Sequence, residues 1–598
     1  MKPIIQNGKI YRFIDFLRIP LRIAPAEAIS GIAFRLILAL LPSLQALVIA
    51  DFIDTALGVF HGSRIRANLY PLLVWLFLII IYNGFYEKIA SFLALRVEMK
   101  LTTIYRSAIA EKRARLEYMH VENNDTWDLI SRVCKNPVER LQGGFSNIIN
   151  CASIILRIAS LLAILITQVW WAGLAITAIS IPLFALAMKA GNAIYEANKE
   201  AQKYTRRAEY LKRILQDREN VEERASFSYT EYVNRQWHAA FEKARKINQK
   251  VMAKYFIRMK GASLVTVLLS VIIIAILLFP LSEGIISIGM FTSLAMATLN
   301  LVQMMSWELS YAISQIAEGR EYLNDLSAFC ALSEKQGALD LPCAADTLTF
   351  ENADFIHVFF RYPGTEKYIL EDFNLHIEKG LHYAVVGING AGKTTLTKLL
   401  TGLYDNFEGE IRINGISIRE YTQAQLKGLF SVVYQDFARY FIPMRENIAL
   451  GNMNLRDEAQ ILEAATTAGL KESIAQLPHG LDTPLGKIQE NGADLSGGQW
   501  QRVALARLLY SPAKVRILDE PTASLDPVAE SNVYKMFGRA STGYSTIFIT
   551  HRLGAAKLAD IILVLDKGQV AEQGTHETLM EVGGIYAQMF EAQRSWYQ

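Results

Sequence analysis

Six long apolar runs dominate the first half of the chain. They lie at residues 32–50, 69–86, 151–167, 171–188, 262–281 and 285–307. A helix that crosses a lipid bilayer needs about 20 mostly apolar residues, and most of these runs reach that length once their flanks are included. The pattern therefore predicts an all-α membrane domain with six spanning helices. The first run begins only at residue 32 and contains Arg35, which is unlike the apolar core of a cleavable signal peptide.

Lysine and arginine residues concentrate in alternate connections between these runs. Residues 1–26, 98–140 and 190–258 carry 5, 8 and 15 of them, whereas the intervening connections carry two at most. Because cytoplasmic loops of membrane proteins are enriched in Lys and Arg, we expect both termini and the two long connections in the cytoplasm. Both connections are rich in helix formers, with predicted breaks near residues 120–131 and 225–233, each suited to a short transverse helix.

Several apolar runs contain or adjoin ionisable residues. Arg35, Asp51 and Asp54 belong to the first, Arg157 to the third, and Glu308 follows the sixth. Charged groups are expensive in lipid and usually face a partner or a cavity. Pairing between helices and contact with a transported substrate are both open for these residues, and Asp54 and Glu308 also suit the ends of spans.

The charge balance divides the chain into two unlike halves. Residues 1–340 contain 38 Lys and Arg against 28 Asp and Glu, whereas residues 341–598 contain 23 against 30. With 52% hydrophobic residues overall, the composition excludes a disordered chain. The four cysteines have no CxxC spacing, which argues against a zinc or redox site.

A phosphate-binding motif follows a short predicted strand in the second half. The strand at 382–387 leads into Gly387–Thr395, which reads GINGAGKTT. The pattern G-x-x-x-x-G-K-[ST] between a strand and a helix predicts a P-loop. Its glycines let backbone N–H groups surround phosphate oxygens, and the helix adds its positive end. Lys393 is expected to reach the β- and γ-phosphates, and the Thr394 hydroxyl suits Mg²⁺.

A second strand ends in two carboxylates. Residues 514–520 read KVRILDE, an apolar run that closes on Asp519 and Glu520. Asp519 is expected to hold Mg²⁺, directly or through water, and Glu520 to polarise the attacking water. Arg516 interrupts the apolar run, so we expect it at a sheet edge or beside an acidic residue.

A glycine pair precedes a helical run between these two motifs. Leu495–Gln499 reads LSGGQ and is followed by WQRVALARLLY. The two glycines expose N–H groups at the start of a helix, which makes a second candidate anion site.

Together these motifs resemble the signature set of the ATP-binding cassette (ABC) transporter superfamily, over nearly all of residues 347–590. The resemblance implies further roles: Gln435 as the Q-loop glutamine, His551 as the switch histidine, and Asp526 in the D-loop sequence Ser-Leu-Asp. Tyr362 matches the aromatic residue that stacks on adenine. The implied ATP-binding residues are Tyr362, Gly387, Asn389, Gly390, Gly392, Lys393, Thr394, Thr395, Leu495, Ser496, Gly497, Gly498, Gln499 and Asp526. The implied catalytic residues are Glu520, His551 and Gln435, and the implied Mg²⁺ ligands are Thr394, Gln435 and Asp519.

The resemblance implies a half-transporter of the ABC exporter type. Its fold would be a six-helix transmembrane domain followed by an α/β P-loop ATPase domain with an α-helical signature subdomain. The expected boundaries are 1–26 for a cytoplasmic elbow, 27–324 for the membrane domain, 325–346 for a linker and 347–598 for the nucleotide-binding domain.

In this family ATP lies between the P-loop of one nucleotide domain and the signature of a second. A chain with one of each is therefore expected to form a homodimer, with a heterodimer of two half-transporters as the alternative. The resemblance also implies that the spans within 171–281 cross to the partner subunit. ATP and Mg²⁺ are the expected cofactors, membrane lipid surrounds the spans, and no nucleic acid is expected. We expect a multi-pass protein of a bacterial inner membrane, with the nucleotide domain in the cytoplasm.

Two stretches of the nucleotide domain favour a peptide as the exported substrate. Residues 434–440 and 485–501 resemble the corresponding parts of peptide and lantibiotic exporters. Both lie in the motor, so a lipid flippase or a multidrug efflux transporter is the alternative, and an ATP-gated regulatory or channel member is less favoured. Only a short elbow-like segment precedes the first span, so a substrate leader would be removed by another protein.

Overall fold

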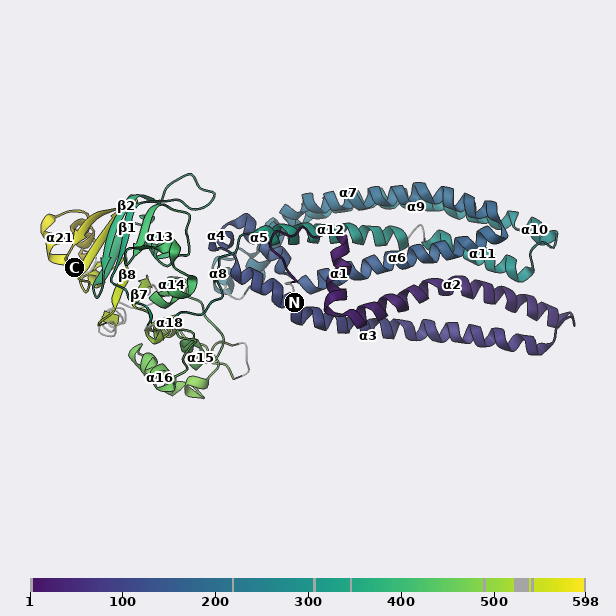
Figure 1. Ribbon diagram of the computed structural model, residues 1–598. Coiled ribbons are helices and arrows are strands. Elements are labelled where there is room, and N and C mark those ends of the chain that lie inside the picture. Colours follow the sequence, from purple (N-terminus) through teal and green to yellow (C-terminus); the bar gives the residue numbers. More distant parts are fainter. Residues whose placement is uncertain are drawn as a thin grey trace. The chain divides into compact units, whose positions relative to one another are not determined.

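Two separately packed units make up the chain. The computed structural model describes residues 4–217, 220–304, 308–344, 347–487, 491–520, 537–538 and 542–595. The membrane unit consists of Met1–Lys112 and Leu129–Leu332, and the cassette unit of Arg113–Asp128 and Ser333–Gln598 (Figure 1). The short segment Arg113–Asp128 is thus packed with the cassette unit although it lies between two parts of the membrane unit in sequence.

Long helices build the membrane unit. They are α1 (Phe13–Ile23), α2 (Pro25–Phe60), α3 (Leu69–Arg115), α6 (Pro137–Gln168), α7 (Trp170–Gln216), α8 (Val221–Phe227), α9 (Thr230–Ile276), α10 (Leu278–Ser282), α11 (Ile288–Gln303) and α12 (Leu309–Ala331). The apolar runs fall, in order, on α2, α3, α6, α7, α9 with α10, and α11. Among the described residues, Pro25–Phe60, Arg66–Arg115 and Pro137–Thr167 are long and apolar enough to cross a membrane, and Ser270–Ser282 and Ile288–Leu301 are shorter apolar helices.

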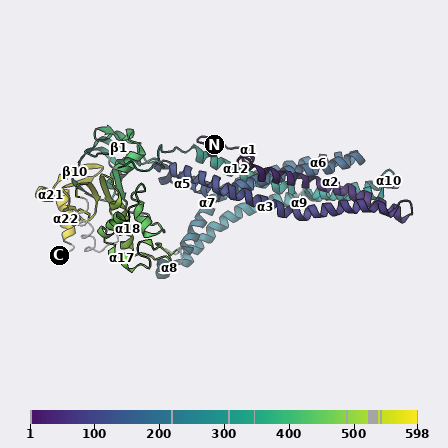
Figure 2. The ribbon, with the colours of Figure 1, turned by 60° about the horizontal axis from the view of Figure 1, so that its bottom comes forward.

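Helix pairs rather than a single central core organise this unit. Helix α2 packs on α6 and α11, and α7 lies along α9 (Figure 1). Where α6, α9 and α11 meet, Leu161, Ile273 and Leu301 are buried together. In Figure 2 the ends of α7 and α9 that flank α8 diverge from α3. By contrast, the apolar side chains of α3 are largely exposed on the chain itself, as expected for a helix that faces lipid or another subunit.

Two arginines within the apolar runs contact neighbouring helices. Arg35 donates to the Tyr86 hydroxyl and to the Ser146 carbonyl, both at 3.1 Å. Arg157 on α6 lies 3.6 Å from the carboxylate of Glu308, which immediately precedes α12. These contacts favour interhelical pairing for Arg35 and Arg157.

Asp54 joins the far end of α2 to the start of α11. One of its carboxylate oxygens accepts from the Gly289 N–H at 2.8 Å, and the other accepts from the Ser287 hydroxyl. It therefore lies at a helix end and contacts the start of another helix, which agrees with the predicted place at the end of a span. Asp51, one turn earlier, is exposed.

Both long connections are broken by short helices. In the first, α4 (Tyr118–Glu122) ends at Asn123, whose side chain accepts from the N–H groups of Asp125 and Thr126 at the start of α5 (Asn124–Cys134). In the second, the short helix α8 covers 221–227 and so begins before the predicted 225–233. It also ends before residue 233, because Ser228 adopts a left-handed backbone conformation with φ 50° and ends the helix.

The end of the membrane unit also differs from the linear pattern. Helix α12 continues to Ala331, and the boundary between the two units falls between Leu332 and Ser333. The segment expected as a linker, 325–346, therefore begins inside a helix.

Two sheets form the framework of the cassette unit. One is antiparallel, in the order β2 (Leu370–Glu378), β1 (Asn352–Phe360), β4 (Glu408–Ile413) and β5 (Ile416–Ser417). The other has the order β10 (Gln569–Gly574), β9 (Ile561–Asp566), β3 (His382–Gly387), β8 (Ser545–Ile549), β7 (Val515–Asp519) and β6 (Phe430–Val433). All strands of the second sheet are parallel except β10. The α/β fold expected for this half is thus observed.

Helices cover these sheets and form a separate helical part. They are α13 (Lys393–Leu400), α14 (Gln423–Leu429), α15 (Met444–Ala449), α16 (Glu458–Thr467), α17 (Lys471–Gln476), α18 (Gly497–Tyr510), α20 (Leu553–Ala556), α21 (His576–Val582) and α22 (Ile585–Arg594).

Arg516 does not lie at a sheet edge. Its strand, β7, pairs with β6 on one side and β8 on the other, and the residue is only 4% exposed. The guanidinium carbon lies 3.8 Å from the ring centroid of Tyr544. A cation–π contact from outside the strand therefore accommodates the charge in a central position, and the predicted edge position is wrong.

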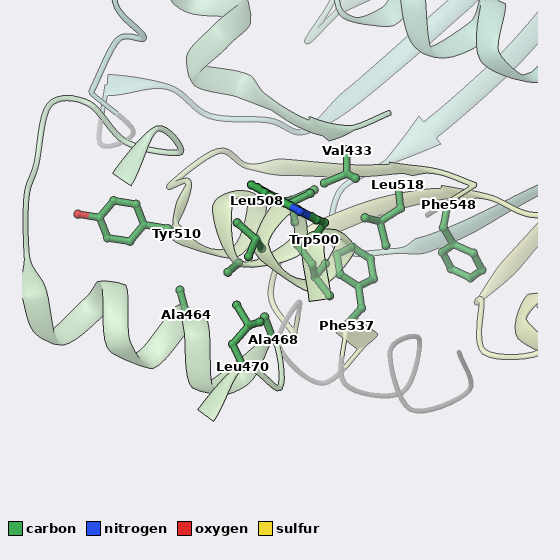
Figure 3. Close-up of a cluster of buried hydrophobic side chains, with 14 of the residues drawn as sticks. Val433, Ala464, Ala468, Leu470, Trp500, Leu508, Tyr510, Leu518, Phe537 and Phe548 are labelled. Carbon is green, nitrogen blue, oxygen red and sulfur yellow. The ribbon is translucent and has the colours of Figure 1, made fainter. Parts of the chain in front are cut away.

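A large aromatic side chain anchors α18 to the second sheet. Trp500 is 1% exposed and packs in a buried cluster with Val433 of β6, Leu518 of β7 and Phe537 (Figure 3). This packing holds the helix that carries the LSGGQ segment against the strands that carry the acidic pair.

We expect Trp500→Ala to destabilise the cassette unit by about 3–5 kcal/mol, because it leaves a large cavity in a packed cluster. The midpoint of thermal unfolding of this unit should fall by about 5–15 °C. Leu462→Ala on α16 is the control, since Leu462 is 49% exposed. Equal losses in the two variants would contradict the anchoring role of Trp500.

Candidate nucleotide site

Four of the predicted motifs follow neighbouring parallel strands. Gly387 ends β3, Gln435 follows β6, Asp519 ends β7 and His551 follows β8. Because β3, β8, β7 and β6 are adjacent and parallel, their carboxyl ends share one edge of the sheet. The structure therefore brings these motifs, which span more than 160 residues of sequence, to a single site.

Backbone conformations that only glycine adopts easily shape the P-loop. Gly390 and Gly392 have φ values of 82° and 101°, and a Cβ on Gly392 would lie 2.7 Å from a methyl carbon of Leu370. Helix α13 begins at the next residue, Lys393. The loop thus turns sharply enough to present N–H groups at the start of a helix, as phosphate binding requires.

The P-loop lysine is held within its own loop. Lys393 is buried, and its Nζ donates to the carbonyls of Gly387 at 2.9 Å and Ile388 at 3.2 Å. Burial lowers the pKa of Lys393, while the carboxylates of Glu520 and Asp519 oppose that shift. A phosphate in the loop would replace these weak carbonyl acceptors with a charged one.

Asp519 provides a test of whether the site suits Mg²⁺. Its side chain is buried, and one oxygen accepts from the Thr394 hydroxyl at 3.4 Å. Among the described residues the other oxygen, Oδ2, has no hydrogen-bond partner. Burial raises the pKa of Asp519 to about 6. The Thr394 hydroxyl oxygen and the two carboxylate oxygens of Asp519, one of them without a hydrogen-bond partner, are oxygen ligands of the kind that a hard divalent cation such as Mg²⁺ prefers.

Glu520 and His551 are in direct contact. Oε1 of Glu520 meets Nε2 of His551, and the Glu520 N–H donates to the Ile549 carbonyl at 3.1 Å. Glu520 has φ 49°, in the left-handed region that non-glycine residues seldom occupy. The backbone therefore turns immediately after β7 and directs this carboxylate toward the loop that follows β8. Such strained positions are concentrated at functional sites.

Tyr362 lies just beyond β1 and is tied to the P-loop helix. Its hydroxyl is hydrogen-bonded to the Thr395 hydroxyl at 2.9 Å. Its ring packs edge-on against Phe360 at 5.2 Å and Tyr404 at 5.7 Å between centroids. A cavity of about 400 Å³ adjoins the ring, lined also by Arg361, Asn406 and Glu408 among others. The structure thus places the predicted adenine-stacking aromatic beside α13.

The LSGGQ segment opens α18. Ser496 is the N-cap residue: its hydroxyl accepts from the Gln499 N–H at 3.3 Å, and its own N–H donates to the Gln499 side chain at 2.9 Å. The Gln499 amide also donates to Ser473 at 3.2 Å. Leu495 is buried, and Gly497 and Gly498 form the first turn. The N–H groups of that turn face the helix start, as the anion-site prediction requires.

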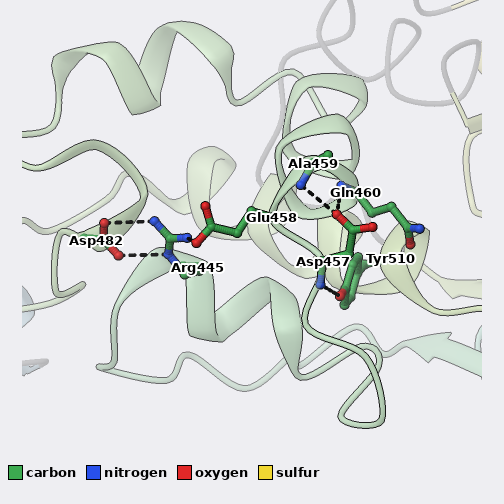
Figure 4. A network of polar contacts seen from close by, with 7 residues as sticks. All are labelled: Arg445, Asp457, Glu458, Ala459, Gln460, Asp482 and Tyr510. Atoms are coloured by element: carbon green, nitrogen blue, oxygen red, sulfur yellow. Dashed lines mark hydrogen bonds and ion pairs between the residues drawn. The ribbon is translucent and has the colours of Figure 1, made fainter.

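Polar contacts fix the helices around α18. Arg445 of α15 donates to Asp482 at 2.8 and 2.9 Å and also pairs with Glu458 of α16 (Figure 4). Asp457 caps α16, and its N–H donates to the hydroxyl of Tyr510, the last residue of α18, at 3.1 Å. The hydrogen bond from Arg445 lowers the pKa of Asp482. This network holds the signature helix in a defined helical part.

Two residues of the predicted site, Asp526 and Gln435, have no contact with the rest of the site that the described residues show. Asp526 lies outside the described residues. Gln435 is exposed in the turn after β6. By contrast, Lys398 carries no motif that singles it out, yet its Nζ lies 5.2 Å from the Tyr362 ring centroid. Its position three residues after Thr395 on α13 places both on one helix face, which is the only local signal.

Comparisons with known proteins agree with this architecture. Residues 29–305 match the family ABC transporter transmembrane region, and residues 370–523 match the family ABC transporter. The subtilin transport ATP-binding protein SpaT of Bacillus subtilis is 29% identical over 524 residues, which cover 86% of this chain and 83% of SpaT. The ATP-dependent lipid A-core flippase of Coxiella burnetii is 30% identical over 522 residues, which cover 86% of each chain.

The fold has a close structural counterpart. The solved structure of a bacterial Atm1-family ABC exporter with ATP bound aligns with a TM-score of 0.76 and 23% identity, and the alignment covers 95% of this chain and 98% of that chain. At this identity the likeness concerns the fold.

The fold and the site define a membrane protein powered by an ATP-binding cassette, and the chain belongs to the ABC transporter family. More particularly, it is an ABC exporter, a multi-pass membrane protein that couples ATP hydrolysis to transport. The fold class and the family expected from the sequence are confirmed.

We expect the pH dependence of Mg²⁺ stabilisation to report on Asp519. Because its pKa in the folded protein is raised, ionisation destabilises the fold as pH rises from about 4 through about 6. A cation that binds the ionised form offsets this cost. Mg²⁺ should therefore raise the thermal unfolding midpoint more at pH 7.5 than at pH 5.

Asp519→Asn should abolish that pH dependence and, without Mg²⁺ at pH 7.5, should be at least as stable as the parent. Glu420→Gln changes an exposed carboxylate of the same unit and serves as the control. An undiminished Mg²⁺ shift at pH 7.5 in Asp519→Asn would show that the cation binds elsewhere.

Proposed function

We propose that this exporter works as a homodimer and moves an amphipathic peptide out of the cytoplasm. Two stretches of the cassette unit, 434–440 and 485–501, resemble those of peptide and lantibiotic exporters. The similarity to SpaT, named for subtilin transport, extends along 86% of this chain. This match over both units is the observation that carries the peptide assignment.

A lipid substrate is the second candidate, because the similarity to the lipid A-core flippase is of equal extent.

The geometry of the cassette unit supports distinct roles in ATP hydrolysis. Lys393 and the P-loop N–H groups would bind the phosphates, with the Tyr362 ring against the base. Glu520 would accept a proton from the attacking water, with its carboxylate oriented by His551. Gln435 would contact the γ-phosphate side from the turn after β6. Thr394, Asp519 and Gln435 would hold Mg²⁺, which neutralises developing charge on the phosphates.

The signature segment supports a dimer. Within the chain, Ser496 and Gln499 make polar contacts in their own helix and with Ser473, so the first turn of α18 is available as an anion site. In a pair of chains, it would close on the ATP held by the partner's P-loop. The divergence of α7 and α9 near α8 supports a crossing of 171–281 to that partner (Figure 2).

We place the cassette unit and both termini in the cytoplasm. The connections rich in Lys and Arg, 98–140 and 190–258, lie on the same side as the termini when six helices cross the membrane. Binding of two ATP molecules would close the cassettes, and hydrolysis would reopen them, because each state is favoured only by its own ligand contacts.

We expect Glu520→Gln to lower the ATPase rate by about 10²–10⁴-fold, since a general base contributes that much. ATP binding should remain, because no phosphate contact is removed, and the protein should accumulate as an ATP-bound closed dimer. Filter binding measures the ATP that stays bound, and cross-linking measures the closure of the dimer. The control is Glu577→Gln, an exposed carboxylate. Hydrolysis at the parent rate would refute Glu520 as the base.

The substrate class is tested with purified protein in proteoliposomes whose cassettes face outward. We expect ATP-dependent accumulation of a labelled cationic amphipathic peptide, and no accumulation with Glu520→Gln. A fluorescent short-chain phospholipid is assayed in parallel. Lipid translocation without peptide uptake would establish the flippase alternative. ATP hydrolysis that moves neither probe would instead favour a gating role.

A further inference from the structure

The P-loop helix carries a second lysine whose surroundings are unusual. Lys398 is largely buried, and its Nζ lies 2.6 Å from Oε1 of Glu122. The same Nζ lies 5.3 Å from the ring centroid of Tyr118 and 5.2 Å from that of Tyr362. All four residues belong to the cassette unit. The ammonium group is therefore shared between one carboxylate and two aromatic faces.

A third aromatic residue, Tyr404, completes this cluster. The Tyr404 hydroxyl donates to Oε2 of Glu122, the other oxygen of the same carboxylate. Its ring packs edge-on against Tyr118 at 5.6 Å and Tyr362 at 5.7 Å. Tyr362 is thus supported by Thr395 through its hydroxyl, by Tyr404 at its edge and by Lys398 over its face. Two of these three residues, Tyr404 and Lys398, also contact the carboxylate of Glu122.

The charge state of the lysine is stabilised in this setting. Burial is the largest single influence and would lower the pKa of Lys398, but the hydrogen bond to Glu122 and the charges of Tyr362, Tyr118 and Glu122 together outweigh it, and the pKa is raised. A permanently charged ammonium over an aromatic ring makes a cation–π contact, which is stronger away from water. The cluster is therefore a charged tether rather than a simple apolar contact.

The tether connects two functionally separate parts of the chain. Tyr118 and Glu122 form α4, in the segment Arg113–Asp128 that directly continues α3 of the membrane unit. Tyr362 is the aromatic proposed to stack on adenine. We propose that Lys398 is a positioning residue that sets the Tyr362 ring for the base and links its occupancy to α4. This inference rests on the adenine role given above to Tyr362.

The proposal has a thermodynamic consequence. If contact with α4 strengthens the stacking of the Tyr362 ring on the base, then binding of the base must strengthen the contact with α4 by the same factor. A simple docking contact between α4 and the cassette unit would show no dependence on the nucleotide base. Base selectivity therefore separates a positioning role from a merely structural one.

The test compares KM and kcat of the full-length protein for Mg²⁺-ATP and Mg²⁺-CTP, because a pyrimidine offers a smaller ring for stacking. We expect Lys398→Gln to raise the KM for ATP about five- to tenfold and the KM for CTP less than twofold, with kcat nearly unchanged. Lys398→Arg should restore the ATP value, since Arg also supplies a cation–π contact. Lys379→Gln removes an exposed ion pair with Glu351 and is the matched control.

A double-mutant cycle addresses the link to α4. Glu122→Gln should reproduce the ATP effect of Lys398→Gln, and neither should raise the KM further in a Tyr362→Leu background. Additive effects, or equal losses for ATP and CTP, would overturn the proposal. So would failure of Lys398→Arg to restore the ATP value while its thermal midpoint matches the parent.

The same cycle distinguishes failure of the underlying role. If Tyr362→Leu alone leaves the ratio of the two KM values unchanged, Tyr362 does not stack on the base. In that case the adenine assignment is wrong and the link through Lys398 falls with it. If Tyr362→Leu changes the ratio and Lys398→Gln does not, only the positioning role is refuted.

Discussion

Parallel pairing of four neighbouring strands determines where the chemistry of this protein takes place. Because β3, β8, β7 and β6 run in the same direction, every loop that leaves their carboxyl ends emerges at one edge. The P-loop, the acidic pair, His551 and Gln435 are each attached to one of these strands. The site therefore depends on sheet register more than on any direct contact between the motifs.

Buried charges at this edge are incompletely satisfied by the protein itself. Lys393 is held by loop carbonyls, and Asp519 keeps one oxygen without a hydrogen bond among the described residues. Arg516, deeper in the same sheet, instead lies over the Tyr544 ring. Their places in the sheet differ: Arg516 lies within a central strand, whereas Lys393 and Asp519 lie at the edge where the motifs meet and are therefore placed to contact a charged ligand.

The segment Arg113–Asp128 shows how the chain connects its two units. It packs with the cassette unit, and its short helix α4 contacts α13 through Glu122 and Lys398. In sequence this segment continues α3 and leads through α5 into α6, and both α3 and α6 belong mainly to the membrane unit. The residue that contacts the P-loop helix α13 is therefore joined through the backbone to helices of the membrane unit.

Local patterns determined much of this protein. The apolar runs predicted the long helices, the motifs of the second half indicated an α/β domain through their resemblance to a family, and the glycine spacing at 387–392 predicted a phosphate-binding turn. These are short-range properties of length, periodicity and backbone freedom. They sufficed for the family and the fold class, and the site residues that they indicate stay predictions.

Contacts between distant residues were decided only by the tertiary structure. Glu122 and Lys398 are 276 positions apart, and neither carries a motif. The central place of Arg516 depends on Tyr544, and the meeting of Glu520 with His551 depends on the pairing of β7 with β8. A linear pattern contains no information about such partners, because burial and strand order, rather than spacing, bring their side chains together.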